Sequence, residues 1–108
     1  MSQIIDGLKV ARDAIAPDLT VQRLLVLMTV AENEGLSQGE LGQLMTRIST
    51  TALSRNLADL SAISSRKAPG PALIRQRPDP DNLRRRQITL TPKGRRLVSR
   101  IKGAFGER

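Results

Sequence analysis

Arginines and short hydroxyl side chains carry the clearest chemistry in this sequence, because both kinds of side chain bind phosphate. Arg84, Arg85 and Arg86 follow a Pro-Asp-Pro-Asp-Asn stretch, and Arg55 follows a run of serines and threonines. A guanidinium forms paired hydrogen bonds with a phosphate or with the edge of guanine. A hydroxyl binds either a phosphate or a base. These residue types predict the binding of a polyanion rather than the making or breaking of a bond.

The residue types that the sequence lacks exclude catalysis and metal binding that depend on cysteine or histidine. The chain has no cysteine and no histidine. Disulfides, thiolate zinc sites and Cys-His or Ser-His catalysis are therefore impossible. Asp79 and Asp81 lie in a proline-rich stretch that is typical of a turn rather than of a metal site. We expect no enzyme, no metal site and no cofactor.

The charge of the chain is concentrated in its second part. Residues 66–108 hold thirteen basic and three acidic residues, a net charge of +10, whereas residues 1–65 hold five basic and seven acidic residues, a net charge of −2. A basic surface on one side of a protein is typical of a nucleic-acid partner. The alternative interpretation is a solvated basic tail.

The hydrophobic pattern predicts the elements that position these residues. Apolar residues at helical spacing indicate helices near 2–15, from 20 to about 33, 37–45, 49–65 and 92–105. Thr20, Ser37, Ser49 and Thr91 are suited to cap the last four of them, and Glu40 completes a capping box with Ser37. Short strands are expected at 72–77 and 84–90, with a turn at 78–82.

This order of elements predicts a mainly α fold with a small β-hairpin wing, a winged helix-turn-helix, as a single domain over residues 1–108. In such folds the second helix of the helix-turn-helix enters the major groove of DNA. The recognition helix is expected at 49–65 and the wing at 75–89, on the minor groove or the backbone. The predicted DNA-binding residues are Ser37, Gln38, Ser49, Thr50, Thr51, Ser54, Arg55, Arg75, Arg77, Arg84, Arg85 and Arg86.

Four segments together resemble the MarR family of bacterial regulators. They are Leu-Ser-Gln-Gly-Glu-Leu at 36–41, Leu-Ser-Arg at 53–55, Leu-Ile-Arg-Gln-Arg-Pro-Asp-Pro at 73–80 and Ile-Thr-Leu-Thr-Pro-Lys-Gly at 88–94. The resemblance implies a homodimer that binds a pseudo-palindromic operator, usually as a repressor. It also implies that Ser54 and Arg55 lie on the recognition helix and that Arg84 is the wing arginine that reaches the minor groove.

The chain departs from the family pattern in three places. Asn82 replaces the family's wing aspartate, which would weaken an ion pair to Arg84 to a hydrogen bond. The connection from residue 61 to residue 72 is longer than usual, and the terminal helices are short. The sequence therefore gives no basis for expecting a small-molecule effector.

The apolar stripes of the two terminal helices are expected to form a dimer face, because symmetric dimers are the most frequent oligomers. The predicted dimer residues are Ile4, Ile5, Leu8, Ile15, Leu97, Ile101 and Phe105. No apolar run is as long as a membrane span, and no signal peptide opens the chain, so we expect a cytoplasmic protein without a membrane partner.

Two other functions remain open at this point. The winged fold could be a protein-interaction module that binds a polymerase or another regulator. A basic RNA-binding protein is disfavoured because Phe105 is the only aromatic residue, and single-strand readers stack bases on aromatic side chains.

Overall fold

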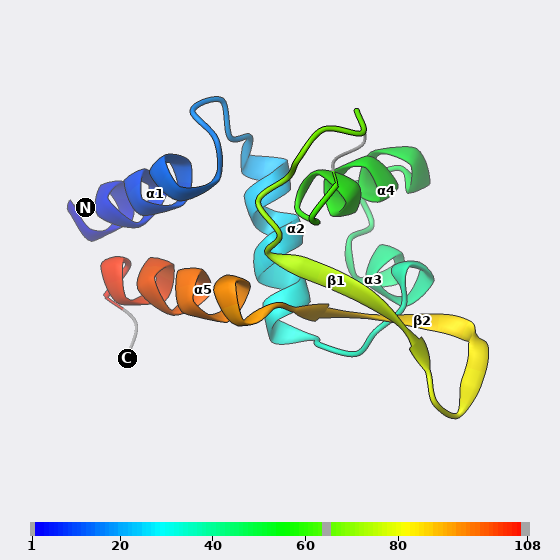
Figure 1. The fold of residues 1–108 in the computed structure, drawn as a ribbon. Coiled ribbons are helices and arrows are strands. Elements are labelled where there is room, and N and C mark those ends of the chain that lie inside the picture. Colours follow the sequence, from blue (N-terminus) through cyan, green and yellow to red (C-terminus); the bar gives the residue numbers. More distant parts are fainter. Residues whose placement is uncertain (1, 64–65, 107–108) are drawn as a thin grey trace.

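The computed structural model describes residues 2–63 and 66–106, which form five helices and one two-stranded antiparallel hairpin. In chain order the elements are α1 (Ser2–Ile15), α2 (Val21–Glu32), α3 (Gln38–Leu44), α4 (Thr50–Asp59), β1 (Ile74–Asp79), β2 (Asn82–Leu90) and α5 (Pro92–Ala104). Figure 1 shows α2 in the middle of the molecule, with α1 and α5 on one side and α3, α4 and the hairpin on the other. Over the described ranges, none of the helices has the length and apolar character to cross a membrane.

The predicted caps begin the four helices that they were assigned to. The hydroxyls of Thr20, Ser37, Ser49 and Thr91 each accept a hydrogen bond from the backbone N–H three residues later, at 3.0–3.2 Å. The capping box is also present, since the N–H of Ser37 donates to Glu40 Oε1 at 2.9 Å. These bonds satisfy amides that have no partner inside the helix, and they fix where each helix starts.

The hairpin is longer than the sequence predicts. Its register pairs Ile74 with Leu90 and Gln76 with Ile88, and the pairing shifts between Pro78 and Asp79. Both strands extend about two residues into the expected turn, which leaves residues 80–81 at the tip. The other edge of β2 is bonded to the loop before α3, where Gly35 N–H donates to Ile88 O and Ile88 N–H donates to Leu36 O, both at 2.9 Å. This loop therefore ties the hairpin to the helix-turn-helix.

The predicted helix 49–65 is shorter in the structure, because α4 ends at Asp59. The carbonyl of Leu60 accepts hydrogen bonds from the backbone N–H groups of Leu73 and Ile74, at 2.8 and 3.3 Å. The residues at the start of β1 thus bond to a carbonyl that would accept an intrahelical hydrogen bond in a longer helix. Residues 61–63 leave the helical path. Residues 64 and 65, the predicted end of this helix, lie outside the described part of the chain.

The hydrophobic core surrounds α2, which buries Leu24, Val26, Leu27 and Val30. It is built from aliphatic residues, as the near absence of aromatic residues predicts. The other buried apolar residues come from all the remaining elements and their junctions: Ala11, Leu41, Leu53, Leu57, Leu60, Leu73, Ile74, Ile88, Leu90, Leu97, Val98 and Ile101.

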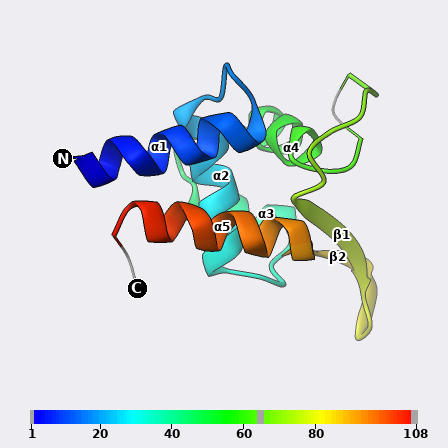
Figure 2. The same cartoon turned by 60° about the vertical axis from the view of Figure 1, so that its left-hand side comes forward.

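The terminal helices α1 and α5 pack along each other within one chain, as Figures 1 and 2 show from two directions. Leu97 and Ile101, predicted to face a partner, are 5% and 0% exposed in the core of the single chain. The ring of Phe105 lies against the backbone of Gly7, where an added Cβ would come within 2.6 Å of the ring. Of the predicted dimer residues on α1, Ile4, Ile5 and Leu8 remain exposed, whereas Ile15 is partly buried and packs against the core.

Candidate nucleic-acid interface

A surface hollow of about 530 Å³ lies between the start of α3 and the outer face of α4. The side chains that line it all belong to the predicted DNA-binding set: Gln38, Thr50, Thr51, Ser54 and Arg55. The four residues from α4 are exposed. The structure thus brings together short polar side chains, one cation and the capped N-terminus of α4, all of which can face a duplex at close range.

The opposite face of α4 is held by a polar network that the sequence reasoning missed. Asn56 is 6% exposed, and its Nδ2 donates to Ala52 O at 2.8 Å. Arg23 of α2 donates from Nε to Asn56 Oδ1 at 3.2 Å and from Nη2 to Asp59 Oδ2 at 2.7 Å. The sequence did contain a signal for this network. Asn56 lies on the same helical face as Leu53, which predicts that it is buried, and a buried amide needs hydrogen-bond partners.

The three consecutive arginines of β2 have different surroundings. Arg84 and Arg86 are exposed, and neither forms an ion pair within residues 2–63 and 66–106. The backbone N–H of Arg84 donates to Asn82 Oδ1 at 3.2 Å, so Asn82 shapes the turn. Arg85 instead points toward α3 and forms ion pairs with Glu40 and Asp79.

The charges around Arg85 stabilise one another. Glu40 accepts hydrogen bonds from the backbone and hydroxyl of Ser37 and lies beside the guanidinium, which together lower its pKa from 4.5 to about 2. The pKa of Asp79 is lowered mainly by the N–H of Asp81 and further by Arg85. Hydrogen bonds to Glu40 and Asp79 raise the pKa of Arg85. All three groups are therefore charged at neutral pH.

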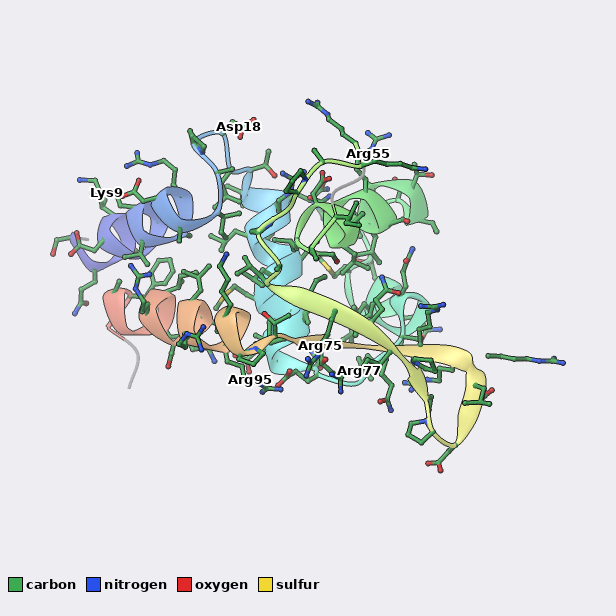
Figure 3. All side chains as sticks on the ribbon, in the orientation of Figure 1. Lys9, Asp18, Arg55, Arg75, Arg77 and Arg95 are labelled. Atoms are coloured by element: carbon green, nitrogen blue, oxygen red, sulfur yellow. The ribbon has the colours of Figure 1, made fainter. Side chains whose placement is uncertain are left out.

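Arg75 and Arg77 lie apart from the hollow. They share one face of β1, and Figure 3 shows both near the base of the hairpin, well away from Arg55 on α4. Arg77 is exposed, whereas Arg75 is partly buried and its Nε has no hydrogen-bond partner in the described part of the chain. Nearby, Arg95 pairs with Glu34 at 2.7 Å. The predicted residues thus fall into separate groups: the hollow on α3 and α4, the arginines of β2, and Arg75 and Arg77 on β1.

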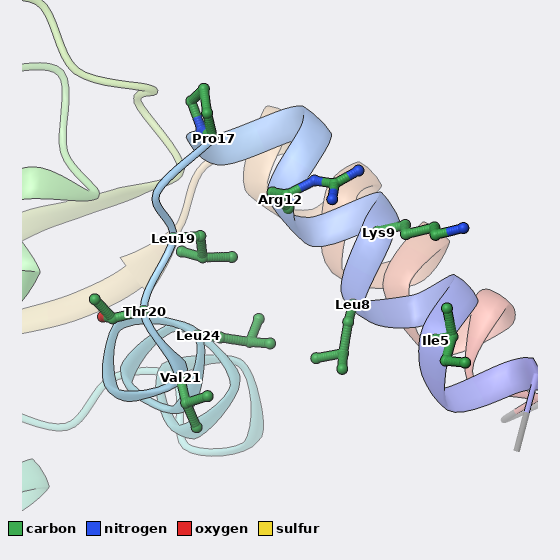
Figure 4. A pocket seen from close by; sticks show the side chains of 9 residues that line it. All are labelled: Ile5, Leu8, Lys9, Arg12, Pro17, Leu19, Thr20, Val21 and Leu24. Atoms are coloured by element: carbon green, nitrogen blue, oxygen red, sulfur yellow. The ribbon is translucent and has the colours of Figure 1, made fainter.

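An apolar groove of about 360 Å³ runs between α1 and the start of α2 (Figure 4). Ile5 and Leu8 of α1 form part of its lining and are 52% and 44% exposed. Lys9 and Arg12 lie at its rim in the view of Figure 4. The groove is on the α1 side of the molecule, remote from the hollow beside α4.

No protein-family profile and no curated protein match this sequence. Solved structures do match. The transcriptional regulator Tm0710 from Thermotoga maritima superimposes with a TM-score of 0.73 at 19% identity, over 96% of this chain and 65% of that one. The transcriptional repressor CouR, bound to a 23-mer DNA duplex, gives 0.69 at 24% identity, over 98% and 66%. The multiple antibiotic resistance repressor MarR gives 0.64 at 21% identity, over 82% and 58%.

The chain has the winged-helix fold of the MarR regulators. This confirms the predicted fold class and the resemblance drawn from the four sequence segments. The chain spans less than two thirds of the length of Tm0710, of MarR and of CouR. These relatives are regulators of transcription rather than enzymes.

Proposed function

We propose that this chain is a sequence-specific, double-stranded DNA-binding regulator of transcription, and that it acts as a repressor. The observation that carries the proposal is the hollow between α3 and α4, because every residue in its lining has a side chain suited to DNA. The recognition helix is then α4, with Arg55 at base edges in the major groove. A repressor among the structural relatives, CouR, was solved on a DNA duplex, which supports the same partner here.

The wing supplies a second contact in this proposal. Arg84 and Arg86 are exposed on β2, and α3 lies between the hairpin and α4 in Figure 1. When the recognition helix lies in the major groove, a hairpin beside it lies at the adjacent minor groove or at the DNA backbone. Arg84 is assigned to the minor groove, whereas Arg75 and Arg77 are assigned to outlying backbone contacts. Ser37 and Ser49, as helix caps, hold the N-termini of α3 and α4 toward phosphates.

A homodimer completes the proposed regulator. Ile4, Ile5 and Leu8 form an exposed apolar face on α1, at 52%, 52% and 44% exposure. A second copy covering this face would place two recognition helices on two half-sites of a pseudo-palindromic operator. Sedimentation of the protein and of Leu8→Glu tests this directly. The dimer is expected for the parent and a monomer for the variant, and a monomeric parent at micromolar concentration contradicts the assembly.

The DNA-binding assignment is tested on duplexes selected from bacterial genomic DNA by the protein itself. Fluorescence anisotropy then compares the parent with Arg55→Ala and Arg84→Ala. We expect Arg55→Ala to lose discrimination between operator and mutated operator, and Arg84→Ala to weaken binding to both. Arg12→Ala is the matched control, because Arg12 is an exposed arginine on α1. If both variants bind as the parent does, the assigned surface is wrong.

A second candidate function is a protein-interaction module for a polymerase or another regulator. Three exposed apolar side chains on α2 and α3 favour it, since Val21, Leu25 and Leu44 are 70%, 54% and 55% exposed along a groove of about 470 Å³. The same anisotropy experiment separates the two functions. A parent protein that binds no duplex even at low salt supports the interaction module.

A further inference from the structure

Arg85 lies where three segments of the chain meet. Its Nη1 donates to Asp79 Oδ2 at the end of β1 at 2.8 Å, and its Nη2 donates to the carbonyl of Gly35 before α3 at 3.0 Å. Its Nε donates to Glu40 Oε1 in α3 at 3.1 Å, and Nη2 contacts the same oxygen. One guanidinium therefore joins the wing to the loop and to the first turn of the helix-turn-helix.

The acceptors of Arg85 are themselves parts of the local structure. Glu40 Oε1 also accepts the backbone N–H of Ser37, so it closes the capping box at the start of α3. The other oxygen of the Asp79 carboxylate accepts the backbone N–H of Asp81 at 2.8 Å, which shapes the hairpin tip. A movement of Arg85 would therefore disturb both the helix start and the turn. Gln38, which lines the hollow, is the first residue of that helix.

The side chain of Arg85 is 26% exposed, and its hydrogen bonds to Gly35, Glu40 and Asp79 are partly buried. Binding a phosphate would mean breaking charge-assisted bonds to two carboxylates. Arg84 and Arg86, its neighbours, are exposed and have no such partners in the described residues. Of the three adjacent arginines, two therefore face solvent, and the middle one bonds to other parts of the protein.

We propose that Arg85 is a positioning residue, which fixes the angle between the wing and the helix-turn-helix so that Arg84 and the hollow reach one duplex together. The proposal rests on the DNA-binding function proposed above. It assigns Arg85 no contact with DNA. Lysine cannot replace it, because an ammonium cannot reach three acceptors in the fixed directions of a guanidinium.

The first experiment measures binding of the selected operator over a series of salt concentrations. A lost phosphate contact lowers the slope of log K against log salt by about one. We expect that result for Arg84→Gln. Arg85→Gln and Arg85→Lys are both expected to lose affinity on the order of tenfold, the size of coupling within one hydrogen-bonded network, because the displaced wing no longer brings Arg84 to the duplex. The double variant Arg84→Gln/Arg85→Gln is therefore expected to keep the slope of Arg84→Gln. A further fall of about one in the slope of the double variant, or parent affinity for Arg85→Lys, would overturn the proposal.

The second experiment removes the partners instead of the arginine. Asp79→Asn and Glu40→Gln leave Arg85 in place but weaken its bonds. We expect each to reduce affinity and to shrink the additional effect of Arg84→Gln, because the wing is no longer held in position. A phosphate-binding Arg85 would predict the reverse, since freeing it would leave binding equal or tighter. These two variants also keep the test available if Arg85→Gln does not fold.

Amide hydrogen exchange supplies a readout that needs no DNA. The N–H groups of Gly35 and Ile88 form the bonds between the loop and β2. We expect faster exchange at both in Arg85→Gln and parent-like exchange in Arg84→Gln, whereas equal exchange in the two variants contradicts the positioning role. If the parent binds no duplex but this difference in exchange is found, the proposed function fails and the structural role of Arg85 stands.

Discussion

Arg23 and Asp59 join α2 to the end of α4, with 2.7 Å between Nη2 and Oδ2. Their side chains are 24% and 16% exposed, so water screens the pair only partly. The same arginine holds Asn56 one turn earlier. Together with the Ser49 cap at its start, this fixes α4 at both ends without using any residue of its outer face.

Loss of this pair should destabilise the fold. Arg23→Met keeps the aliphatic stem but leaves Asp59 Oδ2 and Asn56 Oδ1 without this donor. We expect a loss of about 1–3 kcal/mol in the free energy of unfolding, from hydrogen bonds to charged groups, measured by urea denaturation. Arg12→Met is the control, because its ion pair with Asp13 is 51% and 68% exposed and should be nearly neutral. Equal losses in the two variants would refute a special role for Arg23.

Two glycines of α5 should respond oppositely to alanine. A Cβ at Gly94 would overlap the carbonyl oxygen of Leu73, whereas a Cβ at Gly103 would meet nothing within 4 Å. Gly94→Ala is therefore expected to cost about 1–3 kcal/mol through forced backbone movement. Gly103→Ala should be neutral or stabilise the helix by up to about 1 kcal/mol. Thermal denaturation compares the two, and a tolerated alanine at Gly94 would mean that α5 does not approach β1 so closely.

Acid should weaken the contact between the wing and α3. The pKa of Glu40 is lowered from 4.5 to about 2 in the folded protein, so below pH 4.5 the unfolded chain takes up a proton there before the folded chain does. Its contribution to stability is complete above pH 4.5 and is lost as the pH falls toward 2. The pKa of Asp79 shifts in the same direction. Stability measured across this range should fall less steeply in Glu40→Gln than in the parent, and parallel curves would contradict the assignment.

The buried stripe of α5 and the exposed face of α1 should differ under mutation. Ile101 is fully buried within the chain, so Ile101→Ala is expected to lose about 2–5 kcal/mol at any protein concentration. Leu8 is 44% exposed, and Leu8→Ala should lose less than about 1 kcal/mol in the dilute monomer. A loss at Ile101 that grows with protein concentration would indicate that this residue faces a partner instead.

Local signals in the sequence predicted most of the fold. A hydroxyl before an apolar periodic run marks a helix start wherever it occurs, and all four predicted caps were found. The end of α4 was not predictable in this way, because residues 61–63 continue a pattern compatible with a helix. What ends the helix is a competing partner, the N–H groups of Leu73 and Ile74 on the carbonyl of Leu60, and those lie far along the chain.

The candidate site was predictable in part for the same reason. The outer face of α4 follows from helical spacing alone. By contrast, the run Arg84, Arg85 and Arg86 does not itself say which arginine bonds within the protein. The contacts to Glu40, Asp79 and Gly35 distinguish the middle one from its neighbours. Likewise, two apolar stripes on terminal helices predict that the helices pack, but not whether Leu97 and Ile101 pack within one chain or between two.

The two edges of the small sheet differ in whether their backbone groups have partners, and this difference affects the tendency of the protein to aggregate. One edge of β2 is closed by the bonds to Gly35 and Leu36, whereas within the described residues no strand lies beyond β1. An open edge is a template for a strand of another molecule. On β1 this edge carries Arg75, Arg77 and Pro78, two charges that repel a second copy and a residue without an N–H to donate. We therefore expect the outlying arginines to disfavour ladder growth at this edge, so that replacing both with threonine increases aggregation, measured by light scattering.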